Sequence, residues 1–530
     1  MSAPADTRAE GTPERAPLVL AALILVATVA NLNLSVANVA LPSIARAFDA
    51  SQTELDLVAV AYSLGLAASV LYLGAVGDRY GRKRMLLLGV TFSIPACLIA
   101  AYAPNINVLI AGRLLGGLSA GMAYPTTLAL ITALWSGPPR TKSIALWSGI
   151  GGSMNALGPM VGGALLIWFS WRSVFLLTLP LAVGALVLAV KAIPKHVNEN
   201  SDPVDHLGGV LSAVLVASLV LAINFATVPN EGVVAAVLAG IALVAGGLFF
   251  LRQRRVKDPL FDLKYAARPT FWVAATAGMV VFGSLMGAMF VGQQFMQNVL
   301  GYSTFEAGMA ILPGAVMMIL IAPRSATLVE AKGSRFTLLV GYLLCFVGFL
   351  AMLVLWGDHI PYWKIGLPFA LIGSGIGFAG TPASHSLTGS VPVHRVGMAS
   401  GTADLQRDLG GAIMQSILGA ILTAGYATSF AKQIAASPQA SSVSNSVTDQ
   451  MEKSYAGAAQ IAKAYPQYSD QIVAAAKQSF VDGQHWAYSV GVIAIGIGGL
   501  TVWKFFPNQE DEARLMAEYV STDAVARPSV

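Results

Sequence analysis

Long apolar stretches alternate with short polar segments along almost the whole chain. A helix needs about 20 apolar residues to cross the hydrocarbon core of a bilayer, and fourteen stretches of the sequence meet this length. Polar segments bracket the seventh and eighth stretches, which therefore separate six predicted helices from six more. The predicted membrane-spanning helices are 17–42, 54–76, 84–103, 107–134, 142–168, 172–193, 207–228, 232–252, 270–297, 303–328, 336–356, 361–388, 396–426 and 485–506.

This pattern predicts an all-α integral membrane protein with two six-helix bundles and two inserted helices. The long external loop contains two amphipathic stretches, 447–463 and 465–478, which predict either a packed cap or a gating element. The tail after Phe506 is acidic, and we expect it to be irregular. The predicted segments are an N-terminal tail at 1–16, a first bundle at 17–193, an inserted pair with flanking loops at 194–269, a second bundle at 270–506 with the external loop at 427–484, and a C-terminal tail at 507–530.

Composition and charge support a membrane protein and predict its orientation. Of the 530 residues, 55% are hydrophobic and only 11% are charged, whereas soluble proteins have roughly 25% charged residues. Basic residues concentrate at 78–84 and 252–268, whereas the loop at 43–53 has only Arg46 and that at 298–302 has none. The positive-inside rule therefore predicts a multi-pass membrane protein with both termini in the cytoplasm. The net charge of +5 is an orientation signal and does not indicate nucleic-acid binding.

The polar turn between the second and third predicted helices is rich in glycine and basic residues. Its glycines allow a sharp turn and close helix approach, and its one acid can form an ion pair that breaks when a gate opens. The alternative is a plain positive-inside turn. A degenerate copy at 326–335, with Glu330, Gly333 and Arg335 at matching positions, suggests two related halves. The residues that we expect to form this gate are Gly74, Asp78, Arg79, Gly81, Arg82 and Lys83.

This turn resembles the signature loop of the major facilitator superfamily. The fifth predicted helix contains Gly-Pro followed by Gly-Gly, which removes side chains from one face and distorts the hydrogen-bond ladder. It resembles the antiporter motif of the exporters in that superfamily. With the inserted helix pair, these features resemble the fourteen-helix drug:proton antiporter family. The motif residues are Gly158, Pro159, Gly162 and Gly163.

Ionisable residues inside predicted spans are costly and mark functional positions. Arg113 in the fourth helix resembles an arginine that takes part in proton transfer in this superfamily; the alternative is a side chain that reaches the membrane interface. Asp404 and Asp408 lie on one helix face with Arg407 beside them. The three residues could hold one exchangeable proton, or they could form a structural ion pair. Asp56, near the start of the second helix, is a further candidate for proton coupling.

Polar residues in the first and ninth helices are candidates for the substrate cavity. Asn33 lies where members of the resembled family usually have an Asp that is linked to cationic drugs, so a fixed negative charge is missing here. We assign Asn33, Asn38, Gln294 and Gln297 to the cavity. The alternative for the glutamines is hydrogen bonding between packed helices.

The resemblance implies a proton-coupled antiporter that exports drug-like or amphipathic molecules by alternating access. A dedicated lipid or metabolite exporter is the first alternative, which the missing charge at Asn33 favours, and a non-transporting membrane sensor is the second. We expect no enzyme activity, cofactor or metal, since neither a nucleotide-binding GxxxxGK[ST] loop nor a catalytic or metal-ligand spacing occurs in the sequence. The expected partners are a small-molecule substrate, protons and the lipid bilayer, with no nucleic acid, and the expected state is a monomer.

Overall fold

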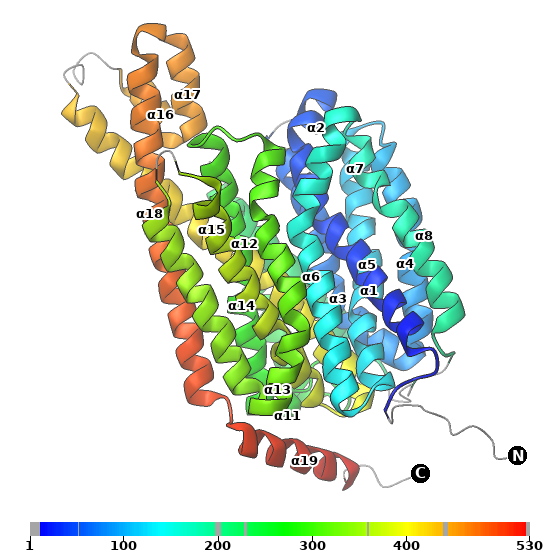
Figure 1. Ribbon diagram of the computed structural model, residues 1–530. Coiled ribbons are helices and arrows are strands. Elements are labelled where there is room, and N and C mark those ends of the chain that lie inside the picture. The colour runs from blue at the N-terminus through cyan, green and yellow to red at the C-terminus, as the bar shows by residue number, and fades with distance from the viewer. Residues whose placement is uncertain are drawn as a thin grey trace, which may run out of the picture.

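The computed structural model describes residues 11–50, 52–195, 197, 203–226, 231–357, 360–437 and 444–525. Within these ranges every regular element is a helix (Figure 1). Most helices run roughly parallel to one another, as expected in a bilayer, where each spanning segment must satisfy its own backbone hydrogen bonds. The all-α fold class is therefore confirmed.

Six long helices form the N-terminal bundle. The first of them continues through a short 3₁₀ turn, η1 (Ala37–Ala40), into α2 (Leu41–Phe48), and α7 (Arg172–Leu176) precedes the last. Small residues allow close packing between these helices: Gly117 of α5 lies against the backbone of Tyr62 in α3. The six helices are α1 (Ala16–Val36), α3 (Gln52–Tyr80), α4 (Arg82–Ala101), α5 (Ile106–Leu134), α6 (Gly137–Trp168) and α8 (Thr178–Ala192).

The C-terminal bundle contains one helical element that is really two spans. α13 covers 52 residues, which as a straight helix would be roughly 78 Å long. Its backbone breaks at Gly333, with φ 80° and ψ 168°. Gly314 before the break and Gly341 after it both pack against α14, so the chain reverses there. The other long helices of this bundle are α12 (Pro269–Asn298), α14 (Tyr362–Gly389), α15 (Val396–Ala436) and α18 (Ser469–Phe505), beside α13 (Thr304–Leu355).

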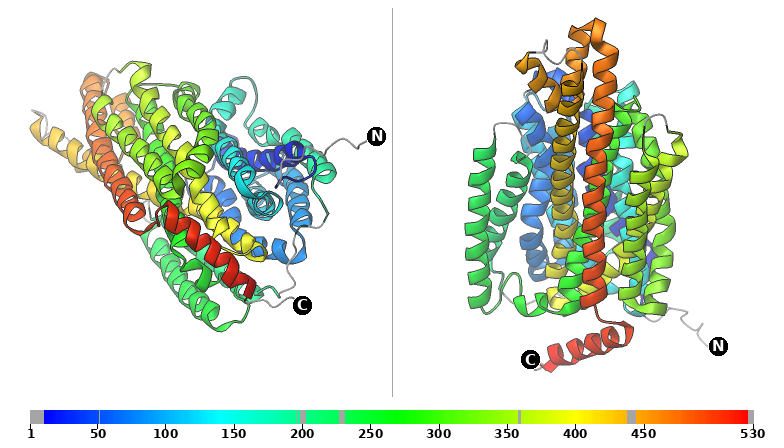
Figure 2. Two further views of the ribbon diagram at one scale, coloured as in Figure 1. Left: turned by 60° about the horizontal axis from the view of Figure 1, so that its bottom comes forward. Right: turned by 90° about the vertical axis from the view of Figure 1, so that its left-hand side faces the viewer.

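Two further helices, α9 (His206–Phe225) and α10 (Gly232–Arg255), stand at the side of the bundles (Figure 2, right). The described residues contain 13 helices that are long and apolar enough to cross a membrane. Because α13 accounts for two of the passes, the prediction of fourteen spanning helices is confirmed. α10 exposes a run of large apolar side chains, such as Val233, Leu243 and Val244, which suits a surface covered by lipid.

The two ends of the molecule differ in structure. We call the end that carries Gly81 and Gly333 the turn face, and the end that carries α16 and α17 the loop face (Figure 1). α1 begins at the turn face, and α19 (Gln509–Val525) lies across it. The remaining short elements are α11 (Leu263–Ala266), η2 (Val393–Arg395), α16 (Asn445–Lys453), α17 (Tyr455–Ala464) and η4 (Pro466–Tyr468).

The structure corrects two expectations about the last third of the chain. The first amphipathic stretch is divided at Ser454, whose hydroxyl caps α17 by accepting from the amide of Gly457. The second is the start of α18, which stays helical because residues such as Phe480 are buried against neighbouring helices. The tail is helical rather than irregular because Glu512 of α19 is buried against the turn face.

Candidate functional site

The turn between α3 and α4 is pinned to the C-terminal bundle by two hydrogen bonds, whose two side chains form an ion pair within the turn. Gly81 adopts φ 114°, which permits the sharp reversal. The buried Asp78 carboxylate accepts from Nε of Arg82 at 2.8 Å and from the amide of Gly397 at 2.6 Å. Arg82 is 1% exposed and also donates to the carbonyl of Val393 at 2.6 Å. The turn face is therefore closed by contacts between residues more than 300 positions apart.

The other residues of the turn have different surroundings. A Cβ at Gly74 would lie 2.9 Å from the carbonyl oxygen of Gly397, so only glycine allows this approach of α3 to α15. Lys83 donates to the carbonyls of Val190 and Ile193 near the end of α8, inside its own bundle. Arg79 lies over the ring of the adjacent Tyr80. Asp78, Arg82 and Gly74 are thus the members of the motif that contact the opposite bundle.

The second turn repeats the backbone of the first but not its ion pair. Gly333 has a positive φ like Gly81, whereas Glu330, at the position of Asp78, is exposed. The carboxylate here comes from α19: Glu512 accepts from the amide of Ser334 at 3.0 Å and from the hydroxyl of Ser386 at 3.4 Å. Burial raises the pKa of Glu512 above its ordinary value, although these hydrogen bonds lower it in part.

The predicted acid cluster lies in α15 and faces both bundles. Nη1 of Arg407 pairs with Asp404 at 3.0 Å, and Nη2 donates to Oγ of Ser384 at 3.1 Å. The guanidinium also lies over the ring of Trp147 in α6 at 4.9 Å and over Phe282 in α12 at 4.7 Å. Arg407 is therefore held from four sides, and one of those contacts belongs to the N-terminal bundle.

Asp408 has no such partner. Oδ2 of Asp408 is buried without a hydrogen bond, as is Oδ2 of Asp404, but no ion pair of the Asp408 side chain occurs among the described residues. Asp408 lies near Tyr62 of α3, and both acids lie near Tyr124 of α5. The hydroxyl of Tyr124 accepts from the side-chain amide of Asn31 at 3.2 Å. The structure thus separates the two acids among the described residues: Asp404 is ion-paired with Arg407, and Asp408 has no ion pair.

Arg113 lies deep within the N-terminal bundle and is 2% exposed, so the interpretation in which it reaches the membrane interface is wrong. It donates to the carbonyl of Asn33 at 2.6 Å and to that of Val58 at 3.3 Å. Its guanidinium lies 5.0 Å from the ring centre of Tyr62 and 5.9 Å from that of Phe175. Tyr62 therefore contacts Arg113 and also interacts with Asp408 of the opposite bundle.

The four candidates for the substrate cavity do not meet one another through hydrogen bonds in the described part of the chain. The side chain of Asn33 is buried and accepts from Thr178 at 3.0 Å, within the N-terminal bundle. Asn38 and Gln297 are exposed, and Gln294 donates to a carbonyl of its own helix. The side chain of Asp56 lies outside the described residues. Assignment of these residues to a cavity stays a prediction.

The glycine motif of α6 packs against both bundles. A Cβ at Gly158 would overlap the hydroxyl of Ser35 in α1, and one at Gly162 would lie 2.7 Å from Val39. A Cβ at Gly163 would instead lie 3.6 Å from the backbone of Phe305, at the start of α13 in the other bundle. The absence of side chains therefore lets α6 approach α1 and α13 at the same level.

Three residues around the acid cluster were not predicted from the sequence. Trp147, Tyr124 and Ser384 contact or neighbour Arg407 from three different helices. A tryptophan, a tyrosine and a serine in apolar runs are common, so no local signal distinguishes these. Only their distance from Arg407 in space identifies them.

Comparisons with known proteins agree with this geometry. The family model of the Major Facilitator Superfamily matches residues 23–415. The chain is 34% identical to the multidrug efflux pump LfrA of Mycolicibacterium smegmatis, over 80% of this chain and 83% of that protein. It is 29% identical to the multidrug resistance protein Stp of Mycobacterium tuberculosis, over 89% and 88%. The solved structure of the proton:xylose symporter XylE has the same fold, with a TM-score of 0.57 and 13% identity over 93% and 96% of the two chains.

Proposed function

Because this chain belongs to the Major Facilitator Superfamily, we propose that it is a proton-coupled antiporter that exports drug-like or amphipathic small molecules by alternating access. Members of this superfamily move small molecules across membranes, and the relatives of this chain include a multidrug efflux pump and a multidrug resistance protein. The two helical bundles rock about the region between them. A proton enters the cell as the substrate leaves.

The observation that carries this proposal is the difference between Asp404 and Asp408. Arg407 is fixed to Asp404 by an ion pair and stacked between two rings, so that pair has a structural role. Asp408 is one helical turn away from Asp404, forms no ion pair among the described residues, and lies near Tyr62 of α3. A carboxylate that is free of an ion pair can take up and release a proton as the bundles move. Protonation removes a charge from the surface that separates the bundles and so changes the energy of separating them.

The turn of α3 and α4 is the gate of this cycle. The ion pair of the turn lies within one bundle. Its carboxylate, Asp78, binds the amide of Gly397 in the other bundle, and its guanidinium, Arg82, binds the carbonyl of Val393 there. These bonds exist only when the turn face is closed. The glycine motif of α6 supports the closed loop-face end, where Gly163 meets Phe305. Asp78 and Gly163 thus act at opposite ends of the two bundles.

The proposal includes the orientation of the protein in the membrane, its oligomeric state and a role for Arg113. The turn face is the cytoplasmic one, because the basic residues gather there, and both chain ends lie on that side of a bacterial cytoplasmic membrane. The protein acts as a monomer and catalyses no covalent reaction. Arg113 joins the proton pathway through Tyr62, whose ring it contacts and which lies near Asp408.

The cargo depends on position 33. Asn33 already accepts from Thr178 and carries no charge, so it does not offer a fixed counter-ion to a cationic drug. This favours neutral or amphipathic substrates. A dedicated lipid or metabolite exporter of the same fold is the second candidate, and the same observation supports it.

The test is a comparison of two single variants in proteoliposomes with an imposed pH gradient. Asp408→Asn should remove the pH dependence of export, because the exchangeable carboxyl is gone. Asp404→Asn should lower the amount of folded protein, since it leaves Arg407 without its partner, but the surviving protein should keep the pH dependence. An unchanged pH profile in Asp408→Asn would contradict the proposal. A panel of cationic dyes, neutral antibiotics and lipids then separates the two cargo candidates.

A further inference from the structure

The inserted helix α9 packs along the seam where α3 of the N-terminal bundle meets α15 of the C-terminal bundle. Val216 and Val220 of α9 are buried together with Ala67 of α3 and Leu409 of α15. α10 lies outside α9, away from the bundles (Figure 2, right). The inserted pair therefore touches both moving halves on one side of the molecule.

The segment that follows α10 reaches the gate. We call residues 256–262 the linker, since they join α10 to the short helix before α12. Leu260 of the linker is 4% exposed and packs against Val70 and Leu71 of α3. Leu405 of α15 and Phe249 of α10 pack against the same cluster, so the linker places a large apolar side chain at the seam between the bundles, two to three helical turns before the end of α3.

The residues beside Leu260 are bound to the C-terminal bundle instead. Arg395 donates to the carbonyl of Pro259 at 2.8 Å, and its guanidinium lies 3.7 Å from the carboxylate of Asp258. The amide of Asp262 lies 3.1 Å from Sδ of Met398. Since the linker also leads through α11 into α12, it is attached to the C-terminal bundle by these contacts and at its end.

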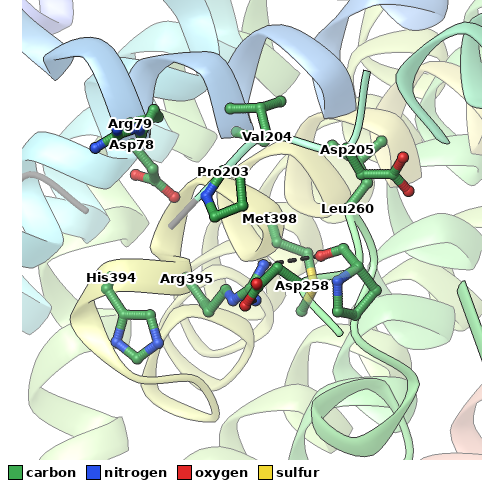
Figure 3. A pocket seen from close by; sticks show the side chains of 12 residues that line it. Asp78, Arg79, Pro203, Val204, Asp205, Asp258, Leu260, His394, Arg395 and Met398 are labelled. Carbon is green, nitrogen blue, oxygen red and sulfur yellow. Dashed lines mark hydrogen bonds and ion pairs between the residues drawn. The ribbon is translucent and has the colours of Figure 1, made fainter. Parts of the chain in front are cut away.

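These contacts lie within the gate. Arg395 stands between Val393, whose carbonyl binds Arg82, and Gly397, whose amide binds Asp78. Figure 3 shows a small cavity here that is lined by the end of α3, the residues just before α9, the linker and residues 394–398. All four segments meet at one point of the turn face.

A network at the ends of the inserted pair also holds the linker. Asp205 caps α9 through the amide of Gly208 at 2.9 Å and pairs with Arg252 of α10 at 2.7 Å. Burial raises the pKa of Asp205, but hydrogen bonds from Arg252, Gly208 and Gln253 outweigh this and leave that pKa below its ordinary value. Gln253 in turn accepts from the amide of Phe261 in the linker at 2.9 Å.

We propose that the linker is a third component of the gate: Leu260 is seated on α3 when the turn face is closed and is withdrawn when the bundles separate. This inference rests on the alternating access proposed above. α9 has its broad contact with α3 and moves with the N-terminal bundle, whereas the linker is held by Arg395 and continues into α12. The contact of Leu260 with α3 therefore joins two parts that move apart.

A reversible cross-link tests this movement. In the double variant Leu71→Cys and Leu260→Cys, a short bifunctional methanethiosulfonate reagent should stop export of a fluorescent efflux substrate from proteoliposomes, and a reductant should restore it. The two native cysteines, Cys97 and Cys345, are both buried, so the wild-type protein treated in the same way reports the background. Full cross-linking with unchanged export would overturn the proposal.

A matched control comes from the inserted pair itself. A Cβ at Gly246 of α10 would lie 3.3 Å from the side chain of Leu215 in α9, and both helices move with the same bundle in this scheme. The double variant Leu215→Cys and Gly246→Cys should therefore cross-link and still export. Loss of export in this control as well would refute the assignment of the two helices to one moving unit.

A second measurement does not depend on transport. The single variant Leu260→Cys should react slowly with a membrane-impermeant maleimide added at the turn face, and addition of Asp78→Asn should accelerate the reaction by opening the gate. An equal rate in both backgrounds would overturn the role of the linker. If wild-type protein exports no substrate but the rates differ as expected, the proposed function fails while the movement of the linker stands.

Discussion

The sharpest prediction concerns Asp78, the acid that ties the turn of α3 to α15. Replacement by Asn removes the negative charge but keeps the size of the side chain. The lost interactions are a charge-assisted bond to the amide of Gly397 at 2.6 Å and the ion pair with Arg82 at 2.8 Å. Arg82 is 1% exposed, so it is left as a buried cation without its partner whenever the turn face is closed.

The expected change in the ratio of closed to open turn face follows from the hydrogen bond between Asp78 and Gly397, which joins the two bundles. A hydrogen bond to a charged group contributes about 1.5–3 kcal/mol, and we take about 2 kcal/mol for the bond to Gly397. Since about 1.4 kcal/mol corresponds to a tenfold change in an equilibrium constant, the ratio of closed to open turn face should fall about thirtyfold. The uncompensated charge of Arg82 acts in the same direction and would increase the effect.

The assay is the distribution of distances between spin labels on the two bundles at the turn face. Lys142 of α6 and Lys332 of α13 are exposed and suit labelling. Asp78→Asn should increase the population with the longer distance and should reduce export, while the amount of protein in the membrane stays the same. Asp511→Asn, which removes a half-buried acid of α19 that pairs with Arg514 at 2.7 Å, is the control. Wild-type distances together with wild-type export would refute the gate.

Two further predictions concern packing and pH. Gly162→Leu should destabilise the protein by about 2 kcal/mol, because a side chain there overlaps Val39 and overpacking typically costs about 1–3 kcal/mol. The control is Gly240→Leu, where a Cβ would have no atom within 4 Å, and it should leave the melting temperature unchanged. Burial raises the pKa of Glu512, so the docked state of α19 favours the protonated carboxyl. Docking should be strongest below the ordinary pKa of a glutamate and weaken as the pH rises through the raised value. Glu512→Gln should abolish this dependence in hydrogen-exchange measurements on α19, and the same pH profile in both proteins would contradict it.

The sequence predicted the fold class and the number of spans, and both predictions hold. The reason is physical: a spanning helix satisfies its backbone within itself and needs about 20 apolar residues, so length and hydropathy suffice. The break at Gly333 was also marked by the sequence, as a copy of the turn at Gly81. Turn glycines are recognisable because few other residues adopt a positive φ.

Length and hydropathy did not predict the helix in the tail of the chain. The tail after Phe506 has no long apolar run, so hydropathy does not predict its helix, although Asn508 and the acidic first turn mark a helix start. Its helix is formed on the turn face, where Asp523 pairs with Arg268 at 2.8 Å and the ring of Tyr519 lies 4.1 Å from the same guanidinium. These partners are about 250 residues apart in sequence.

The residues of the candidate site were in part predicted from the sequence, while their contacts were not. The sequence alone indicated Arg113, Asp404, Arg407 and Asp408 as candidates, because charge within a membrane is costly, and Asp78 as the one acid of a polar turn. It left open which acid Arg407 binds, since Asp404 and Asp408 are both within reach along one helix. The tertiary structure decided this by placing Ser384, Trp147 and Phe282 around the guanidinium on the side of Asp404. Contacts between the bundles join residues far apart in the chain, and no local pattern encodes them, so only the folded structure shows which carboxylate is left unpaired.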